Sequence, residues 1–360
     1  MKKTIYSLFL IFLSIFALAI IYLSTFGLET SRFNNIIINE IKKRDPNIQL
    51  SINKINIKFD FKKIQIYLST VEPQIIYHNI KIPIKKINLY SKILSILKSK
   101  NEINQAIVSF ENFNIKEIQK LAVRAKPSNL KNYLLNNLNG GKVEKLLVDI
   151  NLNENLKISD YNINGSIKNV NFEAFNDLLI QDVSLNFITD KSLTLINSIN
   201  ANYQGILISN GSASLKEKKE IEGKFQTEFN LSEIEINKLF KKSNLIFLEK
   251  NKVNAQGTLT NKFSLKIDKN FKLIDYDYKS IGNISEARIV LKDNFKSSFI
   301  EKPINKILIS STSLEINLNK KNNNLLKFDG LYNLGNLENK KFKISYDLNK
   351  KNPKYLIDID

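Results

Sequence analysis

Apolar residues follow three patterns along the 360-residue chain. Ile5 to Phe26 contains no charged side chain, and about 20 apolar residues span a ~30 Å hydrocarbon core. Residues 31–141 mix amphipathic helices with strands, whereas nearly every segment from 142 onward alternates apolar with polar positions. We therefore predict a transmembrane anchor at 1–30, an α+β domain at 31–141 and a β-rich domain at 142–360.

The apolar stretch favours an uncleaved anchor over a signal peptide, because it exceeds the apolar length of such peptides and no A-x-A-like site follows. Lys2 and Lys3 favour a cytoplasmic N-terminus with an exported domain, although Arg32 and residues 42–44 place basic charge beyond the other end. The predicted anchor residues are Ile5, Leu8, Phe12, Phe16, Ile20, Tyr22 and Phe26.

Short helices are predicted where the period is near 3.6 or where capping residues occur. Two capping boxes, Asn114 with Glu117 and Ser232 with Glu235, mark helix starts. The expected helices cover residues 32–43, 92–98, 114–125, 128–138, 172–179 and 232–240.

The remaining segments are strands with one apolar face, which is typical of an antiparallel sheet. About sixteen such segments are expected after residue 142 by the alternation rule. Several contain a glycine, as at Gly165, Gly205, Gly223, Gly257 and Gly330, and glycines within strands would let a sheet bend. The helices are too few to cover these strands, so the apolar face meets another sheet, closes on itself or takes up lipid. From the pattern alone a sandwich is the commonest solution.

Composition excludes several kinds of chemistry. The chain has no Cys and a single His, His78, so it offers neither a disulfide framework nor a His-based metal cluster. No phosphate-binding loop is present, and His78 has no accompanying nucleophile motif. The formal net charge of +19 arises from dispersed lysines, which argues against nucleic acid as a partner.

The order of these elements resembles that of the AsmA-like family. The anchor leads through Gly27-Leu28-Glu29-Thr30 into a juxtamembrane helix, followed by the strands after Pro46 and by Glu72-Pro73-Gln74-Ile75. A strand-helix unit at 87–97 and glycine-containing strands come next. The resemblance covers most of residues 5–280 in pattern and order rather than in a strict motif.

The resemblance implies a mainly β fold, an elongated, curled antiparallel sheet forming a U-shaped groove, with an N-terminal transmembrane helix and a few short flanking helices. It also implies a bacterial inner-membrane protein with its C-terminal domain in the periplasm, which moves phospholipid between inner and outer membranes. Other envelope proteins would meet its C-terminal end, and neither a cofactor nor enzymatic activity is implied.

Candidate residues follow from the alternation and the charges. The predicted headgroup contacts are Lys42, Lys43 and Arg44. The predicted groove residues are Ile55, Ile57, Phe59, Phe61, Leu185, Phe187, Phe225, Phe229, Phe263, Leu265 and Ile267. The main alternative is a non-enzymatic periplasmic scaffold or assembly factor for outer-membrane proteins, whose apolar face would be packed dry. An outer-membrane barrel is disfavoured by the helical anchor, and an enzyme ranks last.

Overall fold

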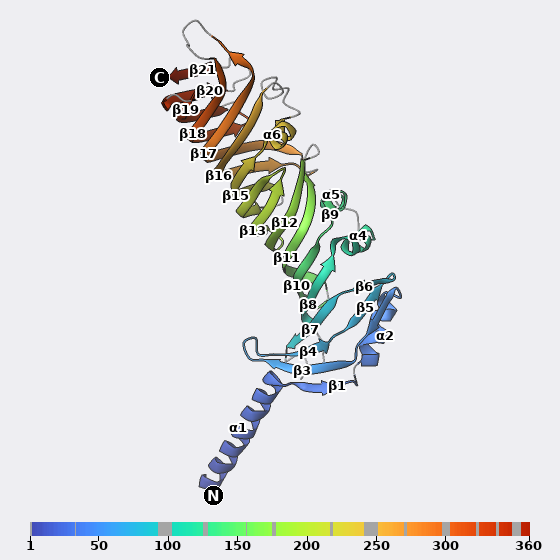
Figure 1. Cartoon of the computed structure of the whole chain (residues 1–360). Coiled ribbons are helices and arrows are strands. Elements are labelled where there is room, and N and C mark those ends of the chain that lie inside the picture. The colour runs from blue at the N-terminus through green and yellow to red at the C-terminus, as the bar shows by residue number, and fades with distance from the viewer. Residues whose placement is uncertain are drawn as a thin grey trace. The chain divides into compact units, whose positions relative to one another are not determined.

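A computed structural model describes residues 2–360 except 33, 93–102, 125–128, 156, 175–177, 217–218, 241–250, 270–271, 297–302, 322–323, 336–337 and 348–353. The chain forms two compact units. The first contains residues 1–124, 142–166 and 188–191, and the second contains 125–141, 167–187 and 192–360. The described strands are mainly antiparallel partners in one sheet of 18 strands, and a separate sheet has three (Figure 1).

The first unit begins with helix α1 (Lys2–Thr25), of which residues 6–25 are long and apolar enough to cross a membrane. Its large sheet runs β1–β3–β4–β7–β8–β10 through antiparallel pairings. Its smaller sheet runs β2–β5–β6, with α2 packed against β2. The elements are β1 (Leu28–Thr30), α2 (Asn34–Arg44), β2 (Ile48–Ser51), β3 (Lys54–Asp60), β4 (Gln65–Val71), β5 (Gln74–Tyr77), β6 (Ile80–Ile82), β7 (Ile84–Lys92), β8 (Ile103–Asn114), α4 (Ile115–Val123) and β10 (Lys142–Leu152).

The second unit is built almost entirely from strands that pair with the next strand in sequence, from β13 to β21. Figure 1 shows them side by side in chain order. The elements are α5 (Asn129–Asn137), β9 (Leu138–Asn139), β11 (Ile158–Ala174), β12 (Leu178–Thr189), β13 (Leu193–Tyr203), β14 (Ile206–Lys216), β15 (Glu220–Leu231), α6 (Glu233–Phe240), β16 (Lys252–Ile267), β17 (Leu273–Phe295), β18 (Ile304–Asn319), β19 (Leu325–Asn333), β20 (Lys340–Asp347) and β21 (Lys354–Ile359). The first residues of β11 and the last of β12 belong to the first unit.

The sheet of the second unit is curled. β9 pairs with β11, and on a flat sheet it would lie six strand spacings, roughly 29 Å, from β16. The α5 helix that precedes β9 has 9 residues and spans only about 13 Å. Yet Asn129, at its first residue, donates a hydrogen bond of 3.1 Å to the carbonyl of Lys269 in the β16–β17 turn. The predicted curled antiparallel sheet is therefore confirmed, and the strands do not close into a barrel.

Bulges bend several strands of this sheet. The β13–β14 register shifts around Ser198, the β14–β15 register around Asn210 and the β18–β19 register around Ser311. Each of these three residues has a positive φ. A bulge adds one unpaired residue and increases the local right-handed twist. The bulges combine short polar residues with glycine, since Gly211 follows Asn210 within the β14–β15 shift and Gly257 lies at the β16–β17 shift.

Two sequence expectations about secondary structure are wrong. Phe172 lies in β11, where it pairs with Leu138, so the helix expected at 172–179 is replaced by the end of one strand and the start of the next. In addition, the part of the chain described after residue 142 contains twelve strands rather than about sixteen, because β17 alone runs for 23 residues.

Other helix predictions are confirmed. α2, α4, α5 and α6 match the helices expected near 32–43, 114–125, 128–138 and 232–240. The Asn114 side chain accepts a hydrogen bond of 2.9 Å from the Lys116 amide, as expected of an N-cap. The helix expected at 92–98 lies almost wholly outside the described residues. The predicted boundary at 141 remains a prediction, and β10, just beyond it, pairs with β8.

Candidate functional site: the apolar face of the second unit

One face of the curled sheet is apolar, and alternation along each strand places its residues there. On β15, Phe225 and Phe229 share this face with Thr227, while the residues between them are exposed. Strand pairing continues the face across the sheet, with Thr227 opposite Leu259 and Gly282 opposite Leu314. The half-buried apolar side chains of this inner face include Ile221, Phe225, Phe229, Leu259, Phe263, Leu265, Ile284, Ile316, Leu318, Leu326, Phe328 and Ile344.

The inner face is the concave one, because its centre is buried without a second sheet. Ser280 is 0% exposed and Asn261 is 1% exposed, and the two lie opposite each other on β17 and β16. All described strands of the second unit belong to one sheet. On the convex side of a single sheet, neighbouring side chains diverge and leave such residues open to water. The curl instead brings neighbouring side chains together over this row.

Glycines on the inner face make room for aromatic rings from neighbouring strands. A Cβ at Gly223 would lie 2.5 Å from Cζ of Phe263, and one at Gly257 would lie 2.8 Å from Cζ of Phe229. Each ring therefore lies across the adjacent strand. The rings of Phe225 and Phe263 are 6.1 Å apart between centroids, within the range of aromatic contact.

A buried polar cluster crosses the centre of this face. The amide nitrogen of Asn261 donates to the hydroxyl of Thr227 at 3.2 Å, and its carbonyl oxygen accepts from the hydroxyl of Tyr278 at 2.7 Å. Burial raises the pKa of Tyr278. Tyr278 therefore remains a neutral donor at physiological pH. Asn261, Thr227 and Tyr278 satisfy one another, which favours a single strand register. The buried hydroxyl of Ser280 has no hydrogen-bond partner among the described residues.

Helix α6 covers one end of the inner face through contacts with β15 and β16. Ile236 on the helix and Leu231 at the end of β15 are both buried. The predicted capping box is present, because Oε2 of Glu235 accepts from both the amide and the hydroxyl of Ser232 at 2.8 Å. These bonds lower the pKa of Glu235. Among the described helices, α6 is the one that makes extensive contacts with the strands from β15 to β20.

The opposite, outer face is polar and carries cross-strand ion pairs. Lys343 lies 3.1 Å from Asp329, and Glu315 lies within 4.0 Å of both Lys279 and Lys327. A hydrogen bond from Asn317 is the largest cause that lowers the pKa of Glu315, and the charges of Lys327 and Lys279 lower it further. Exposed pairs stabilise a protein only slightly. They show which face the sheet presents to water.

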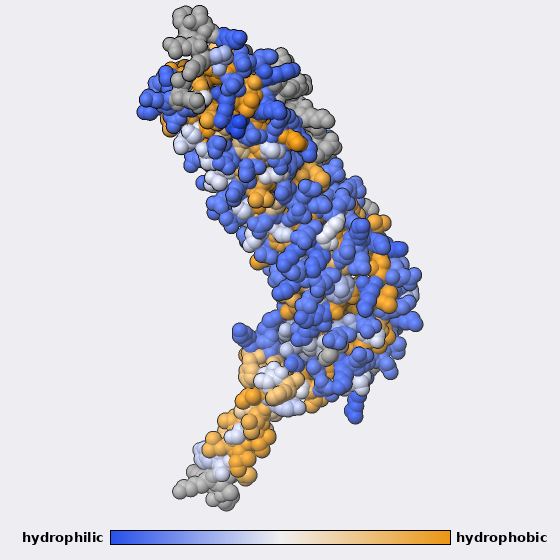
Figure 2. Space-filling view, viewed as in Figure 1, coloured by the Kyte–Doolittle hydropathy of each residue, from blue (hydrophilic) through white to orange (hydrophobic). Residues whose placement is uncertain are grey.

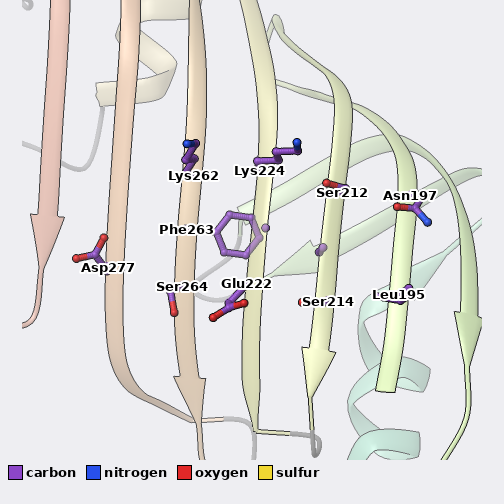
Figure 3. A pocket seen from close by; sticks show the side chains of 12 residues that line it. Leu195, Asn197, Ser212, Ser214, Glu222, Lys224, Lys262, Phe263, Ser264 and Asp277 are labelled. Carbon is purple, nitrogen blue, oxygen red and sulfur yellow. The ribbon is translucent and has the colours of Figure 1, made fainter. Parts of the chain in front are cut away.

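A hollow of about 500 Å³ lies over β13–β17. Most of its lining residues, such as Ser214, Glu222 and Ser264, alternate along their strands with the inner-face residues and pair with one another across the sheet. Figure 3 shows the Phe263 ring against β15, with Ser212 and Ser214 on the next strand and Leu195 beyond them. Lys224 and Lys262 lie along one side of the hollow (Figure 3). The hollow is broad and open, so it offers no enclosed site for a small polar substrate.

The predicted groove residues fall in two places. Leu185, Phe187, Phe225, Phe229, Phe263 and Leu265 are half-buried on strands β12, β15 and β16, and Ile267 is buried at the end of β16. In the first unit, Ile57 and Phe59 are half-buried on β3. Ile55 is 0% exposed and belongs to the packed core, and Phe61 is exposed in the β3–β4 turn. Neither Ile55 nor Phe61 therefore belongs to the inner face of the second unit.

The other predicted residues lie in the first unit. Leu8, Phe12, Phe16 and Tyr22 are exposed along α1, Ile20 is partly covered, and Phe26 follows the end of the helix. Ile5 is in α1, but its side chain lies outside the described set. Lys42 and Lys43 are exposed in the last turn of α2, where positive charge also complements the helix dipole. The side chain of Arg44 lies outside the described set as well.

His78 lies in the β5–β6 turn, where its ring contacts that of Tyr77 with a centroid separation of 4.4 Å. Its amide donates to the carbonyl of Asn47, which ties the turn to the start of β2. Over the described ranges, no cluster of His, Cys, Asp and Glu is arranged to hold a metal ion. No family model, no curated protein and no solved structure matches the chain.

Proposed function

We propose that the chain is a membrane-anchored protein that binds phospholipid acyl chains on the apolar face of its second unit and contributes to lipid transport between the inner and outer membranes of a bacterial envelope. α1 holds the protein in the inner membrane, and the β domain lies in the periplasm. The resemblance to the AsmA-like family supports this assignment of compartment and cargo.

One observation carries the proposal: a continuous row of aromatic and branched side chains remains half-buried on the concave face, over several strands. Removing one methylene group from water is worth about 0.8 kcal/mol, so an acyl chain of ordinary length gains several kcal/mol on such a surface. The polar headgroup can stay at the rim, in water. Movement then requires only that neighbouring sites have similar affinity, which the repeated strand pattern supplies.

The test is native mass spectrometry with lipid extraction on the full-length chain. Phe225→Asp with Phe229→Asp places two charges on the inner face, whereas Gln226→Asp with Asn230→Asp places two on the exposed face of the same strand. We expect bound phospholipid to be lost from the inner-face variant and retained in the outer-face variant. Far-ultraviolet circular dichroism checks that both variants fold.

A wild-type chain that is folded, extracted in a lipid-free detergent and devoid of phospholipid would contradict the proposal. That result would favour the scaffold alternative, in which the apolar face is packed against protein. Equal lipid loss in the two variants would also count against it, because the effect would then follow from charge rather than from the inner face.

A further inference from the structure

We infer that the β3–β4 hairpin of the first unit is a second membrane contact, which inserts its tip into the interfacial layer of the bilayer that α1 spans. The tip is the turn Phe61-Lys62-Lys63-Ile64. The inference rests on α1 being the membrane anchor proposed above. It concerns a different surface from the lipid-binding face.

The hairpin is held directly against the end of α1. Only Gly27 separates Phe26 from β1, and Leu28 of β1 pairs with Ile57 of β3. The ammonium group of Lys58 donates to the carbonyl of Thr25 in the last turn of the helix at 3.1 Å. Gly27 also approaches β3 closely, since a Cβ there would lie 2.8 Å from Cγ of Lys58. The first unit therefore fixes β3 at the membrane end of the helix.

The turn lies within reach of the bilayer surface. Phe61 is four residues beyond Ile57, which corresponds to roughly 13 Å of extended strand. Figure 1 shows the β3–β4 hairpin beside the junction of α1 and β1. Figure 2 shows that the hydrophobic colouring of α1 continues onto the adjoining end of the first unit.

The side chains around this junction are apolar and exposed. Phe26 is 71% exposed, Leu28 52%, Phe61 56% and Ile64 68%. Single exposed apolar residues are common on protein surfaces. Here four of them gather at the end of a helix whose own surface is apolar, so they extend an interface that already faces lipid. The Phe59 ring supports that of Phe61 through an edge contact at 5.3 Å.

The backbone of the turn is consistent with a binding role. Ile64 has φ +51°, and it is the one β-branched residue with a positive φ among those described. Asn or Gly would adopt this conformation with less strain. The strained position instead carries a large apolar side chain that no described element covers. Burial of that side chain in the bilayer interface would offset the strain.

The charges of the turn suit an anionic membrane surface. Lys62 is exposed, and its amide and that of Lys63 donate to the carboxylate of Asp60, which folds the turn. The ammonium group of Lys63 is directed inward, to Gln105 at 2.7 Å and over the Tyr90 ring. Lys62 is therefore the cation that the turn offers to lipid phosphates.

The chain contains no Trp, so a single introduced Trp reports on one site. Full-length Phe61→Trp is reconstituted into two sets of vesicles of equal parts phosphatidylcholine and phosphatidylglycerol. A portion of the phosphatidylcholine is brominated near the headgroup end of its acyl chains in one set, to report on Phe61→Trp, and near their methyl end in the other, to report on Phe16→Trp at the middle of the apolar span. Asn155→Trp, in the β10–β11 turn of the same unit, is the water-exposed control, and Phe16→Trp in α1 is the inserted control. We expect a blue-shifted emission for Phe61→Trp and quenching several-fold stronger than for Asn155→Trp. Adding Ile64→Asp should reduce that quenching.

The controls separate the two ways of failing. If Phe16→Trp is quenched and Phe61→Trp behaves like Asn155→Trp, α1 is an anchor and the hairpin is not a membrane contact. If Phe16→Trp is not quenched either, the anchor itself is wrong, and the hairpin inference is overturned with it.

Discussion

Replacing Gly282 with Ala tests whether the inner face is packed as closely as the structure indicates. A Cβ at Gly282 would lie 2.0 Å from the carbonyl oxygen of Thr258 and 2.7 Å from Cα of Leu259. Both are backbone atoms of β16, so no side-chain rotation relieves the contact. The two strands must separate locally, which weakens ladder hydrogen bonds.

The expected change in the free energy of unfolding is the difference between two opposing effects. Overpacking costs about 1–3 kcal/mol, and Ala in place of Gly returns about 0.4–1 kcal/mol by restricting the unfolded chain. Because the contact at 2.0 Å is with a backbone atom, the upper end of the overpacking range applies, and we expect a net loss of about 2 kcal/mol. For a unit of this size that loss lowers Tm by roughly 4–8 °C. Gly223→Ala is the matched control. Its Cβ would meet the tip of the Phe263 ring at 2.5 Å and the Ser212 carbonyl oxygen at 2.8 Å, a milder backbone contact than the 2.0 Å contact at Gly282, so we expect a smaller loss of stability.

The assay is thermal unfolding of the full-length chain in detergent, followed by circular dichroism in the strand region. Gly223→Ala should melt between wild type and Gly282→Ala. If Gly282→Ala were as stable as wild type, or more stable than Gly223→Ala, the close approach of β16 and β17 described here would be wrong.

Three further outcomes are expected. Asn261→Leu should cost about 1–3 kcal/mol in urea unfolding, because the buried Tyr278 hydroxyl loses its acceptor. Glu235→Gln should destabilise the chain at neutral pH but not in acid. The folded pKa of Glu235 is lowered below 4.5, so its stabilising contribution is present above 4.5 and is lost as pH falls through the folded value, which paired urea titrations would reveal. Ile64→Asn should raise the free energy of unfolding by up to about 1 kcal/mol, since Asn accepts a positive φ, and a fall in urea midpoint would contradict this reasoning.

Much of the architecture could be predicted because alternation determines which face a side chain occupies. The positions of Phe225 and Phe229 on the half-buried face of β15 follow from a period of two, and the capping box at Ser232 identifies α6. The length of the apolar helix α1, which is sufficient to cross a membrane, is equally direct, since it follows from an uninterrupted run of apolar residues.

The failures have physical causes. The segment around Phe172 has too few residues for its period to distinguish helix from strand, and pairing with β9, which is distant in sequence, decides the outcome. β17 exceeds its predicted segments because its polar residues face outward instead of turning the chain. The β13 residues of the β13–β14 bulge around Ser198 include no glycine, so the alternation rule gives no sign of it.

The exposure of Phe61 in a turn also has a local cause. Its spacing from Phe59 matches a strand face, yet Asp60 accepts two backbone hydrogen bonds and ends the strand one residue earlier. A short polar side chain that bonds its own backbone can override the alternation that surrounds it. Asp60, whose carboxylate accepts hydrogen bonds from two following backbone amides, is the residue in the sequence that indicates a turn at Phe61.

The neighbour-to-neighbour pairing of β13 to β21 bears on how such a chain can change its length. Each of these strands gains its partners from the strands adjacent in sequence, so energetic coupling is local and nearly additive, as in repeat proteins. Because antiparallel neighbours reverse direction, two strands are the smallest insertion that leaves the direction of every later strand unchanged. Gene duplication of one hairpin would therefore lengthen the apolar surface by two strand widths while preserving its sidedness.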